Sequence, residues 1–280
     1  MIHLSGDAIR HQLKTRVFGQ SVLYMEQTGS TNTELKSLAR SGAPEGFLYV
    51  ADEQFVGRGR LKRSWNAPAG SSLLFSLLFR PGGFLAPIQT QRLTMICALA
   101  LAEAVEYVTD LTIKLKWPND LVSENGQKLC GILSELELEG SQLDWVVVGL
   151  GLNVNLDFSQ DTQPQADSGL SLAQTATSLS MLLGRDTAAL RLPILQRCLE
   201  NIEQRYEALK RGESPHHDWQ VRLVGKGQPV TVTNVSSDEQ WEGIMLGVDD
   251  NGALRVEQPN GSIETILAGD VTLRKTQSNE

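Results

Sequence analysis

A helical rhythm of apolar residues marks the segment from Leu93 to Val108, and it constrains the fold more than any other feature of the chain. The apolar positions are three or four residues apart, as on the face of a helix that packs into a core. They are Leu93, Ile96, Cys97, Ala100, Leu101, Ala104, Val105 and Val108. Arg92, Glu103 and Glu106 flank or interrupt the segment, which argues against a membrane span. We therefore expect a core helix and no association with a membrane.

Short segments that are apolar or alternating, as strands are, surround this helix. They are Phe47–Ala51, Ser72–Phe79, Ile113–Trp117, Gly131–Leu138 and Trp145–Asn155. The last two are separated by Glu139-Gly140-Ser141-Gln142, a composition typical of a hairpin loop, so we expect them to pair in antiparallel fashion. Apolar residues from Leu195 to Leu209 again follow one helical face, and Arg211-Gly212 predicts the end of that helix.

The pattern changes beyond Val221 to short β segments separated by glycine, proline and Asn-Gly turns. This predicts a small β-barrel, which at about 50 residues has little core of its own and is expected to pack against the preceding part of the chain. We expect an α+β fold with a mixed, largely antiparallel sheet and helices packed on it. The predicted division is residues 1–220 for the main domain and 221–280 for the small one.

The charge of the chain limits its partners. It has 25 Lys and Arg against 33 Asp and Glu, which gives 25 − 33 = −8 and argues against binding to the DNA backbone. Three cysteines, widely spaced in apolar sequence, suggest neither a disulfide framework nor a zinc site. The first nineteen residues are not built like an export signal. We therefore expect a cytoplasmic protein.

The segment from Gly57 to Trp65, here called the arginine-glycine loop, reads Gly-Arg-Gly-Arg-Leu-Lys-Arg-Ser-Trp. Glycines let the backbone approach a ligand, and guanidinium groups bind phosphate oxygens in pairs and stay charged. In an acidic chain this composition favours an anion-binding loop. A solvated basic loop is the simpler alternative, and a single-stranded RNA contact is a third, although the loop is not repeated as such contacts usually are.

Two further segments place lysines at strand ends. Lys116-Trp117-Pro118-Asn119-Asp120 ends a predicted strand in a turn, so its lysine and its carboxylate are candidates for a phosphate and a Mg²⁺ ion. A plain turn is the alternative. Lys128 opens the strand that continues through Gly131, and a flanking surface charge is its alternative explanation.

Two more segments complete the candidate site. Gly149-Leu150-Gly151-Leu152-Asn153 is a strand whose glycines would make room for a ligand, or whose packing requires them. In Ser30-Thr31-Asn32-Thr33-Glu34, Thr31 and Glu34 are predicted to form a capping box, which would leave Ser30 and Asn32 free to bind a polar head group.

In this order and spacing, these segments resemble the biotin protein ligases over nearly the whole chain. The resemblance implies an enzyme that forms biotinyl-5′-AMP from biotin and ATP with Mg²⁺, and then biotinylates a lysine of a biotin carboxyl carrier protein. It also implies that the small C-terminal domain is a Src-homology-like β-barrel. A homodimer is compatible with this assignment, and a DNA partner is not expected.

The resemblance also implies a role for each matching residue. Ser30, Thr31, Asn32, Gln54, Arg58, Gly59, Arg60, Lys128 and Gly131 would bind biotin. Arg63, Trp65, Lys116, Asn119, Asn153 and Arg274 would bind ATP, and Asp120 would bind Mg²⁺. Arg58, Arg60, Lys116 and Lys128 would act in catalysis, and the arginine-glycine loop is expected to cover the adenylate.

Two departures from the family pattern bear on this assignment. Lys62 stands where the family loop usually has glycine, a departure that bears on loop mobility and adenylate retention. Repressor members begin with a winged helix-turn-helix domain, whereas about twenty residues precede Tyr24, so we expect a ligase without the DNA-binding half. A lipoate or octanoate ligase or transferase is the alternative enzyme, and a biotin sensor without catalysis, or a nucleic-acid binder, is the alternative from another class.

Overall fold

The computed structural model describes residues 4–57, 59, 65–165, 169–233, 240–267 and 270–273. Within these ranges, seven strands form a mixed sheet in the order β1-β2-β3-β7-β6-β5-β4. Its strands are β1 (Val22–Thr28), β2 (Leu48–Gln54), β3 (Ser72–Phe79), β4 (Lys114–Lys116), β5 (Asp120–Val122), β6 (Lys128–Glu139) and β7 (Gln142–Asn153). Only β1 and β2 pair in parallel among these strands, so the expected largely antiparallel sheet is confirmed.

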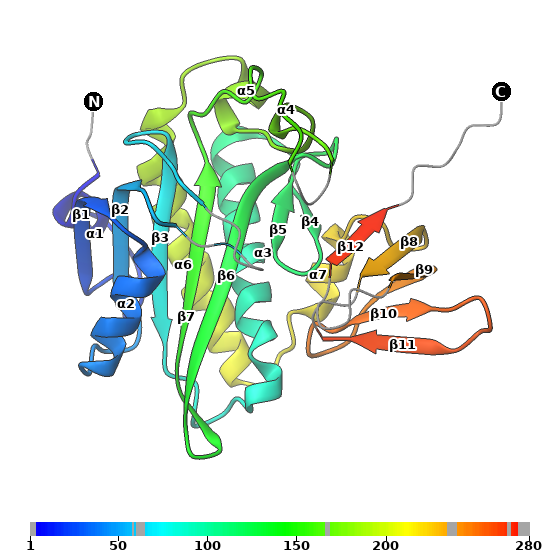
Figure 1. Cartoon of the computed structure of the whole chain (residues 1–280). Coiled ribbons are helices and arrows are strands. Elements are labelled where there is room, and N and C mark those ends of the chain that lie inside the picture. The colour runs from blue at the N-terminus through cyan, green and yellow to red at the C-terminus, as the bar shows by residue number, and fades with distance from the viewer. Residues whose placement is uncertain are drawn as a thin grey trace.

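Helices cover both faces of this sheet (Figure 1). They are α1 (Gly6–Arg10), α2 (Thr31–Arg40), α3 (Gln91–Thr109), α4 (Leu172–Thr175), α5 (Leu179–Leu183), α6 (Arg191–Lys210) and α7 (His216–Arg222), with 3₁₀ turns at Pro87–Gln89 and Ala188–Leu190. The long helices α3 and α6 pack together behind the sheet, and α2 lies on the opposite face over β2, β3 and β7. The predicted core helix and its partner are therefore confirmed as α3 and α6.

Strand β3 has the sequence Ser-Leu-Leu-Phe-Ser-Leu-Leu-Phe, which lacks the alternation of a half-exposed strand. All eight of its residues are buried, because α6 packs on one of its faces and α2 on the other. Phe75 and Phe79 belong to the large core with α3 and α6, whereas Leu78 belongs to a small core with Leu35 of α2 and Trp145 of β7. The sheet thus separates two hydrophobic layers.

The predicted hairpin is also confirmed. Strands β6 and β7 pair in antiparallel register from Cys130↔Leu152 to Glu139↔Gln142. This long ribbon forms the centre of the sheet together with β3, and it extends below the other strands in Figure 1.

Beyond α7 the described chain forms a second, antiparallel sheet of five strands, which lies beside β4 and β5 (Figure 1). Its strands are β8 (Pro229–Thr233), β9 (Gln240–Val248), β10 (Leu254–Glu257), β11 (Ile263–Ile266) and β12 (Asp270–Leu273), in the order β11-β10-β9-β8-β12. Val230, Val232 and Leu254 are buried in the same hydrophobic cluster as α3, so this module shares a core with the main sheet. The α+β fold is confirmed.

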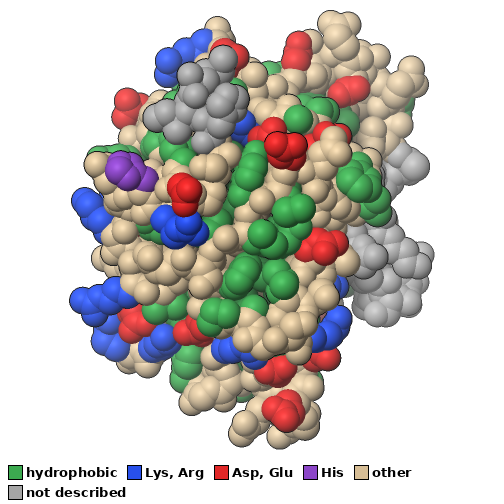
Figure 2. Space-filling model, turned by 90° about the vertical axis from the view of Figure 1, so that its left-hand side faces the viewer, with side chains coloured by type: hydrophobic (Ala, Val, Ile, Leu, Met, Phe, Trp, Pro, Cys, Tyr) green, Lys and Arg blue, Asp and Glu red, His purple; other side chains and the backbone are tan. Residues whose placement is uncertain are grey.

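At the opposite end of the main sheet, β1 is the outer strand. Leu23 and Met25 point outward from it and are 36% and 39% exposed. Figure 2 presents this side of the molecule and shows a band of hydrophobic side chains among charged ones. In the part of the chain that the structure describes, no helix is both long and apolar enough to cross a membrane.

Candidate active site

Three glycines leave part of the α2-facing side of the sheet without side chains of its own. Gly131 of β6 and Gly151 of β7 are directly paired, and the indole of Trp65 lies over both. A Cβ atom at Gly151 would be 2.6 Å from Trp65 Nε1, and one at Gly131 would be 3.2 Å from Trp65 Cζ3. Real Cβ atoms essentially never approach as closely as the 2.6 Å at Gly151, and 3.2 Å at Gly131 is tighter than most, so the ring fits on the sheet because these side chains are missing. We call the surface formed by Gly131, Gly149 and Gly151 the glycine floor.

Asn32 covers the third glycine of this floor. A Cβ atom at Gly149 would be only 2.0 Å from Asn32 Oδ1. The Asn32 amide group is held at both ends: Ser76 Oγ donates to Oδ1 (2.6 Å), while Nδ2 donates to the carbonyl oxygen of Leu133 (3.1 Å) and to Glu135 Oε2 (2.9 Å). Buried polar groups of this kind are costly to leave unpaired, so the orientation of the amide is fixed. The Asn32 side chain is thus not free, as the sequence suggested, and its role as a head-group ligand stays a prediction.

Glu135 is held in turn by Lys36, whose ammonium group donates to Glu135 Oε1. Ser76, Glu135 and Lys36 were not predicted from the sequence. Ser76 carried one signal, because it is a polar residue between two runs of apolar residues. Nothing in the sequence indicated Glu135 and Lys36, since they are about a hundred residues apart and both resemble ordinary surface charges.

The predicted capping box of Thr31 and Glu34 is wrong. Helix α2 begins at Thr31 after Ser30, and the Ser30 side chain makes no capping hydrogen bond. The Thr31 amide instead donates to Gln54 Oε1 (3.0 Å), and Thr31 Oγ1 lies within hydrogen-bond distance of Ser76 Oγ (2.8 Å). A side chain from β2 therefore satisfies the helix end that a local cap was expected to satisfy.

Gln54 also fixes the base of the arginine-glycine loop. Its Nε2 donates to the backbone oxygen of Trp65 (3.0 Å), and the Trp65 amide donates to the Gly57 oxygen (2.8 Å). A Cβ atom at Gly57 would be 1.8 Å from the Trp65 oxygen, so this close pairing requires glycine. One buried amide side chain thus connects the start of α2 with both ends of the loop. Of the predicted loop ligands, Gly59 is described and partly buried, whereas Arg58, Arg60 and Arg63 lie outside the described residues, as does Arg274.

Two of the predicted lysines lie beside one carboxylate. Lys128 Nζ is 2.7 Å from Asp120 Oδ1 and 5.5 Å from the centre of the Trp65 ring, and Lys116 is the direct strand partner of Asp120. Lys128 also lies over Gly131, where a Cβ atom would be 3.2 Å from its Nζ. The structure therefore places the Lys128 ammonium group at the edge of the glycine floor, in an ion pair with Asp120.

The two predicted asparagines of the nucleotide site are occupied by backbone contacts. Asn119 Nδ2 donates to the Ile132 oxygen, and Asn153 Nδ2 donates to the Thr177 oxygen (3.0 Å). Both side chains thus support the surrounding loops through their amide nitrogens. A contact with a nucleotide through either of them stays a prediction.

A polarity swap tests the role of Asn32. On the resemblance to biotin protein ligases, Asn32→Asp is expected to lower biotin affinity by about 10- to 100-fold, because the introduced carboxylate would face Glu135 and the Leu133 oxygen with no proton to donate. The neighbouring charge would raise the pKa of the introduced carboxyl group, so affinity should recover as the pH falls and that group becomes a donor again. Calorimetric titration with biotin over a pH series measures both effects.

The matched control is the double variant Asn32→Asp with Glu135→Gln. It exchanges donor and acceptor between the two positions and removes the facing negative charge, so most of the lost affinity should return. If the single variant bound biotin like the parent protein, Asn32 would have no part in recognition.

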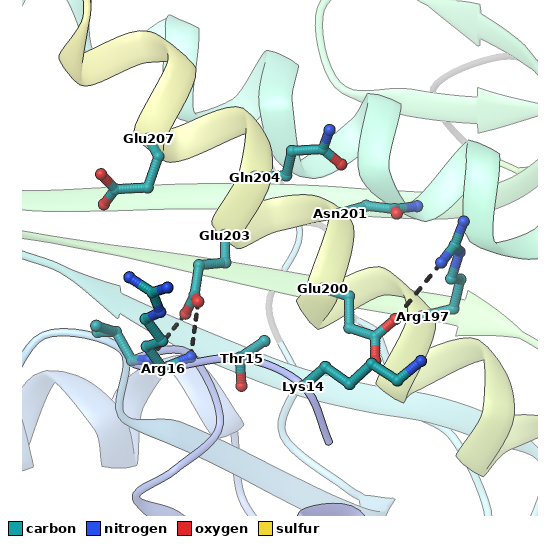
Figure 3. A pocket seen from close by; sticks show the side chains of 10 residues that line it. Lys14, Thr15, Arg16, Arg197, Glu200, Asn201, Glu203, Gln204 and Glu207 are labelled. Atoms are coloured by element: carbon teal, nitrogen blue, oxygen red, sulfur yellow. Dashed lines mark hydrogen bonds and ion pairs between the residues drawn. The ribbon is translucent and has the colours of Figure 1, made fainter. Parts of the chain in front are cut away.

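A cavity of about 480 Å³ lies elsewhere, between α6 and the segment that follows α1. Figure 3 shows its polar lining, in which Glu203 reaches across from α6. The Glu203 carboxylate accepts the amide protons of Arg16 (2.6 Å), Val17 (2.8 Å) and Phe18 (3.1 Å). Three consecutive amides could bind an anion, but here they bind the protein's own carboxylate. The cavity is thus a structural junction, separate from the glycine floor.

The chain was compared with known proteins. Residues 24–153 match the biotin/lipoate A/B protein ligase family, and residues 226–274 match the biotin protein ligase C terminal domain. The bifunctional ligase/repressor BirA of Bacillus spizizenii is 35% identical over 273 residues, which are 96% of this chain and 79% of that protein. The biotin–[acetyl-CoA-carboxylase] ligase of Paracoccus denitrificans is 33% identical over 255 residues, 88% of this chain and 98% of that one. Among solved structures, the biotin protein ligase of Aquifex aeolicus in complex with biotin and ATP aligns with a TM-score of 0.69 at 27% identity, covering 92% of this chain and all of that one.

Proposed function

The chain belongs to the biotin protein ligase family, and on this premise we propose that it activates biotin with ATP and transfers it to a lysine of a biotin carboxyl carrier protein. The acceptor would be of the acetyl-CoA carboxylase type, as in the ligases of Paracoccus denitrificans and Mycobacterium tuberculosis. The observation that carries the proposal is the geometry of the glycine floor. It is bounded on one side by oriented amide and hydroxyl groups and on the other by lysine.

In the proposed first step, the biotin carboxylate attacks the α-phosphorus of ATP, and pyrophosphate leaves with the bonding electron pair. The polar end of the floor, with Thr31, Asn32 and Gln54, would hold the ureido ring through donors and acceptors that are already oriented. Lys128, at the other end, would contact the reacting carboxylate and stabilise the charge that develops there. Lys116, on the neighbouring strand, would bind the phosphates.

In the second step, the neutral amine of the carrier lysine attacks the carbonyl carbon of the adenylate. The carbon–nitrogen bond forms, AMP leaves with the electron pair of the anhydride bond, and the amine loses a proton. Arg58 and Arg60 are proposed to bind the carboxyl and phosphate oxygens of the adenylate until the acceptor arrives. Arg63, Trp65 and Arg274 are proposed to contact the nucleotide, as are Asn119 and Asn153.

Mg²⁺ is proposed to arrive with ATP. This ion is usually held by one or two carboxylates together with substrate phosphates, and it neutralises the charge of the leaving pyrophosphate. Asp120 would supply the single carboxylate, from β5 between the strands of Lys116 and Lys128. Its ion pair with Lys128 would then also orient that lysine.

We propose further that residues 1–220 form the catalytic unit and residues 221–280 an accessory one, and that the protein works in the cytoplasm. The net charge of −8 supports the absence of a DNA partner. Homodimer formation stays a prediction.

One experiment tests the function directly. The protein is incubated with ATP, Mg²⁺, biotin and a purified biotin carboxyl carrier domain, and the carrier is weighed by mass spectrometry. A gain of one biotinyl group is expected. With lipoate or octanoate in place of biotin no gain is expected, and a gain there alone would favour the lipoate ligase alternative.

A further inference from the structure

The two residues on either side of Lys116 are both held by the C-terminal part of the chain. The Val224 amide donates to the Leu115 backbone oxygen (2.9 Å), so the linker after α7 runs along the free edge of β4. On the other side, Trp117 Nε1 donates to the backbone oxygen of Gly252 (3.0 Å), in the turn between β9 and β10. Trp117 is only 3% exposed, so this hydrogen bond is shielded from water.

The turn that contains Gly252 is itself rigidly built. Asp249 Oδ1 accepts the amide protons of Asn251 (2.8 Å) and Ala253 (2.9 Å). Gly252 has φ +82°, and a Cβ atom there would be 2.6 Å from the Gln91 side chain. Only glycine therefore fits both the backbone conformation and the space.

The N-terminus of α3 connects the same turn with the loop after Lys116. Arg92 donates to the Asp250 backbone oxygen (3.0 Å) and to Asn251 Oδ1 (3.1 Å). Its neighbour Gln91 packs against Gly252 and donates from Nε2 to the Pro118 oxygen (2.9 Å). The turn, the helix end and the loop after Lys116 are thus one connected set of contacts.

We propose that the turn 249–253 is a positioning element for the nucleotide side of the site, and that Trp117 transmits its effect to Lys116 and Asp120. This inference rests on the proposed function. A lysine that binds phosphate must be held close to one position to be effective, and Lys116 lies on a strand of only three residues. Its strand pairs with β5 on one side, and its two neighbours Leu115 and Trp117 are held by the C-terminal part of the chain.

Trp117→Phe removes the indole donor and leaves the Gly252 oxygen buried without a partner. Trp219→Phe is the matched control: Trp219 is also buried, at 1% exposure, but its Nε1 has no hydrogen-bond partner among the described residues. We expect Trp117→Phe to raise KM for ATP about 10-fold, a ratio that corresponds to roughly 1.4 kcal/mol. The Kd for biotin alone, measured by calorimetry, should stay within about twofold of the parent value, which is less than 0.5 kcal/mol on the same scale. Trp219→Phe should change neither the KM for ATP nor the Kd for biotin by more than about twofold.

Gly252→Ala disturbs the same connected set of contacts at a different point, because the added methyl group would displace the Gln91 side chain from the Pro118 oxygen. The same selective rise in KM for ATP is expected, and this variant carries the test if Trp117→Phe does not fold. Equal effects on ATP and biotin, or equal effects of Trp117→Phe and Trp219→Phe, would overturn the inference. A parent protein that releases no pyrophosphate from ATP with biotin would instead overturn the proposed function.

Discussion

Replacing Lys128 with alanine is expected to slow adenylate formation by about 10²- to 10³-fold, the usual cost of losing one preorganised group that stabilises developing charge. Lys128 Nζ lies against Gly131 and 2.7 Å from Asp120, so it is held at the edge of the glycine floor rather than free in solvent. Its loss removes a positive charge from the proposed position of the reacting carboxylate and also leaves Asp120 without its ion-pair partner. Pyrophosphate release with biotin and ATP measures the first half-reaction alone.

A control variant and a second measurement make this test specific. Lys114→Ala removes a positive charge from β4, the strand of Lys116, but from a residue with no part in the proposed site, so adenylate formation should change little. Calorimetry with biotin alone should show a much smaller effect of Lys128→Ala than the rate does, because Lys128 is proposed to act on the reacting carboxylate and not on the ureido ring. A normal rate of pyrophosphate release in Lys128→Ala would remove the residue from the mechanism.

The sequence predicted the parts of this structure that depend on local pattern. Helix α3 follows from a rhythm repeated over sixteen residues, and the β6–β7 hairpin follows from two alternating segments joined by a short polar loop. Both need only neighbours along the chain to be recognised. The fold class followed because these elements succeed one another in a characteristic order.

The parts that the sequence did not predict depend on contacts between distant residues. The capping box failed because Gln54, twenty-three positions away, supplies the acceptor for the Thr31 amide. The fixed orientation of Asn32 depends on Glu135, and the position of Trp117 depends on Gly252, which is 135 positions away. Composition can indicate that a residue type suits a ligand, but it does not show which other side chains already occupy it.

The glycines of β7 lie between these two cases, because the sequence indicated that they make room without indicating for what. Gly149→Ala is expected to weaken biotin binding by about 10- to 100-fold, since the new methyl group would coincide with the Asn32 amide, and overpacking of this kind typically costs 1–3 kcal/mol. Asn32 would have to leave Ser76 and Glu135, so the head-group end of the site would lose its orientation. Biotin titration by calorimetry measures the loss.

A double-mutant cycle with Asn32→Ala shows whether the loss arises in this way. The three atoms nearest to a methyl group at position 149 all belong to the Asn32 side chain, so once that amide is gone Gly149→Ala should cost little in that background. Gly83→Ala is the control for a glycine substitution, because a Cβ atom at Gly83 meets no atom within 4 Å. If the two single effects on biotin affinity simply added, Gly149 would act through the packing of β7 rather than through Asn32, and the glycine floor would no longer explain why the ligand binds here.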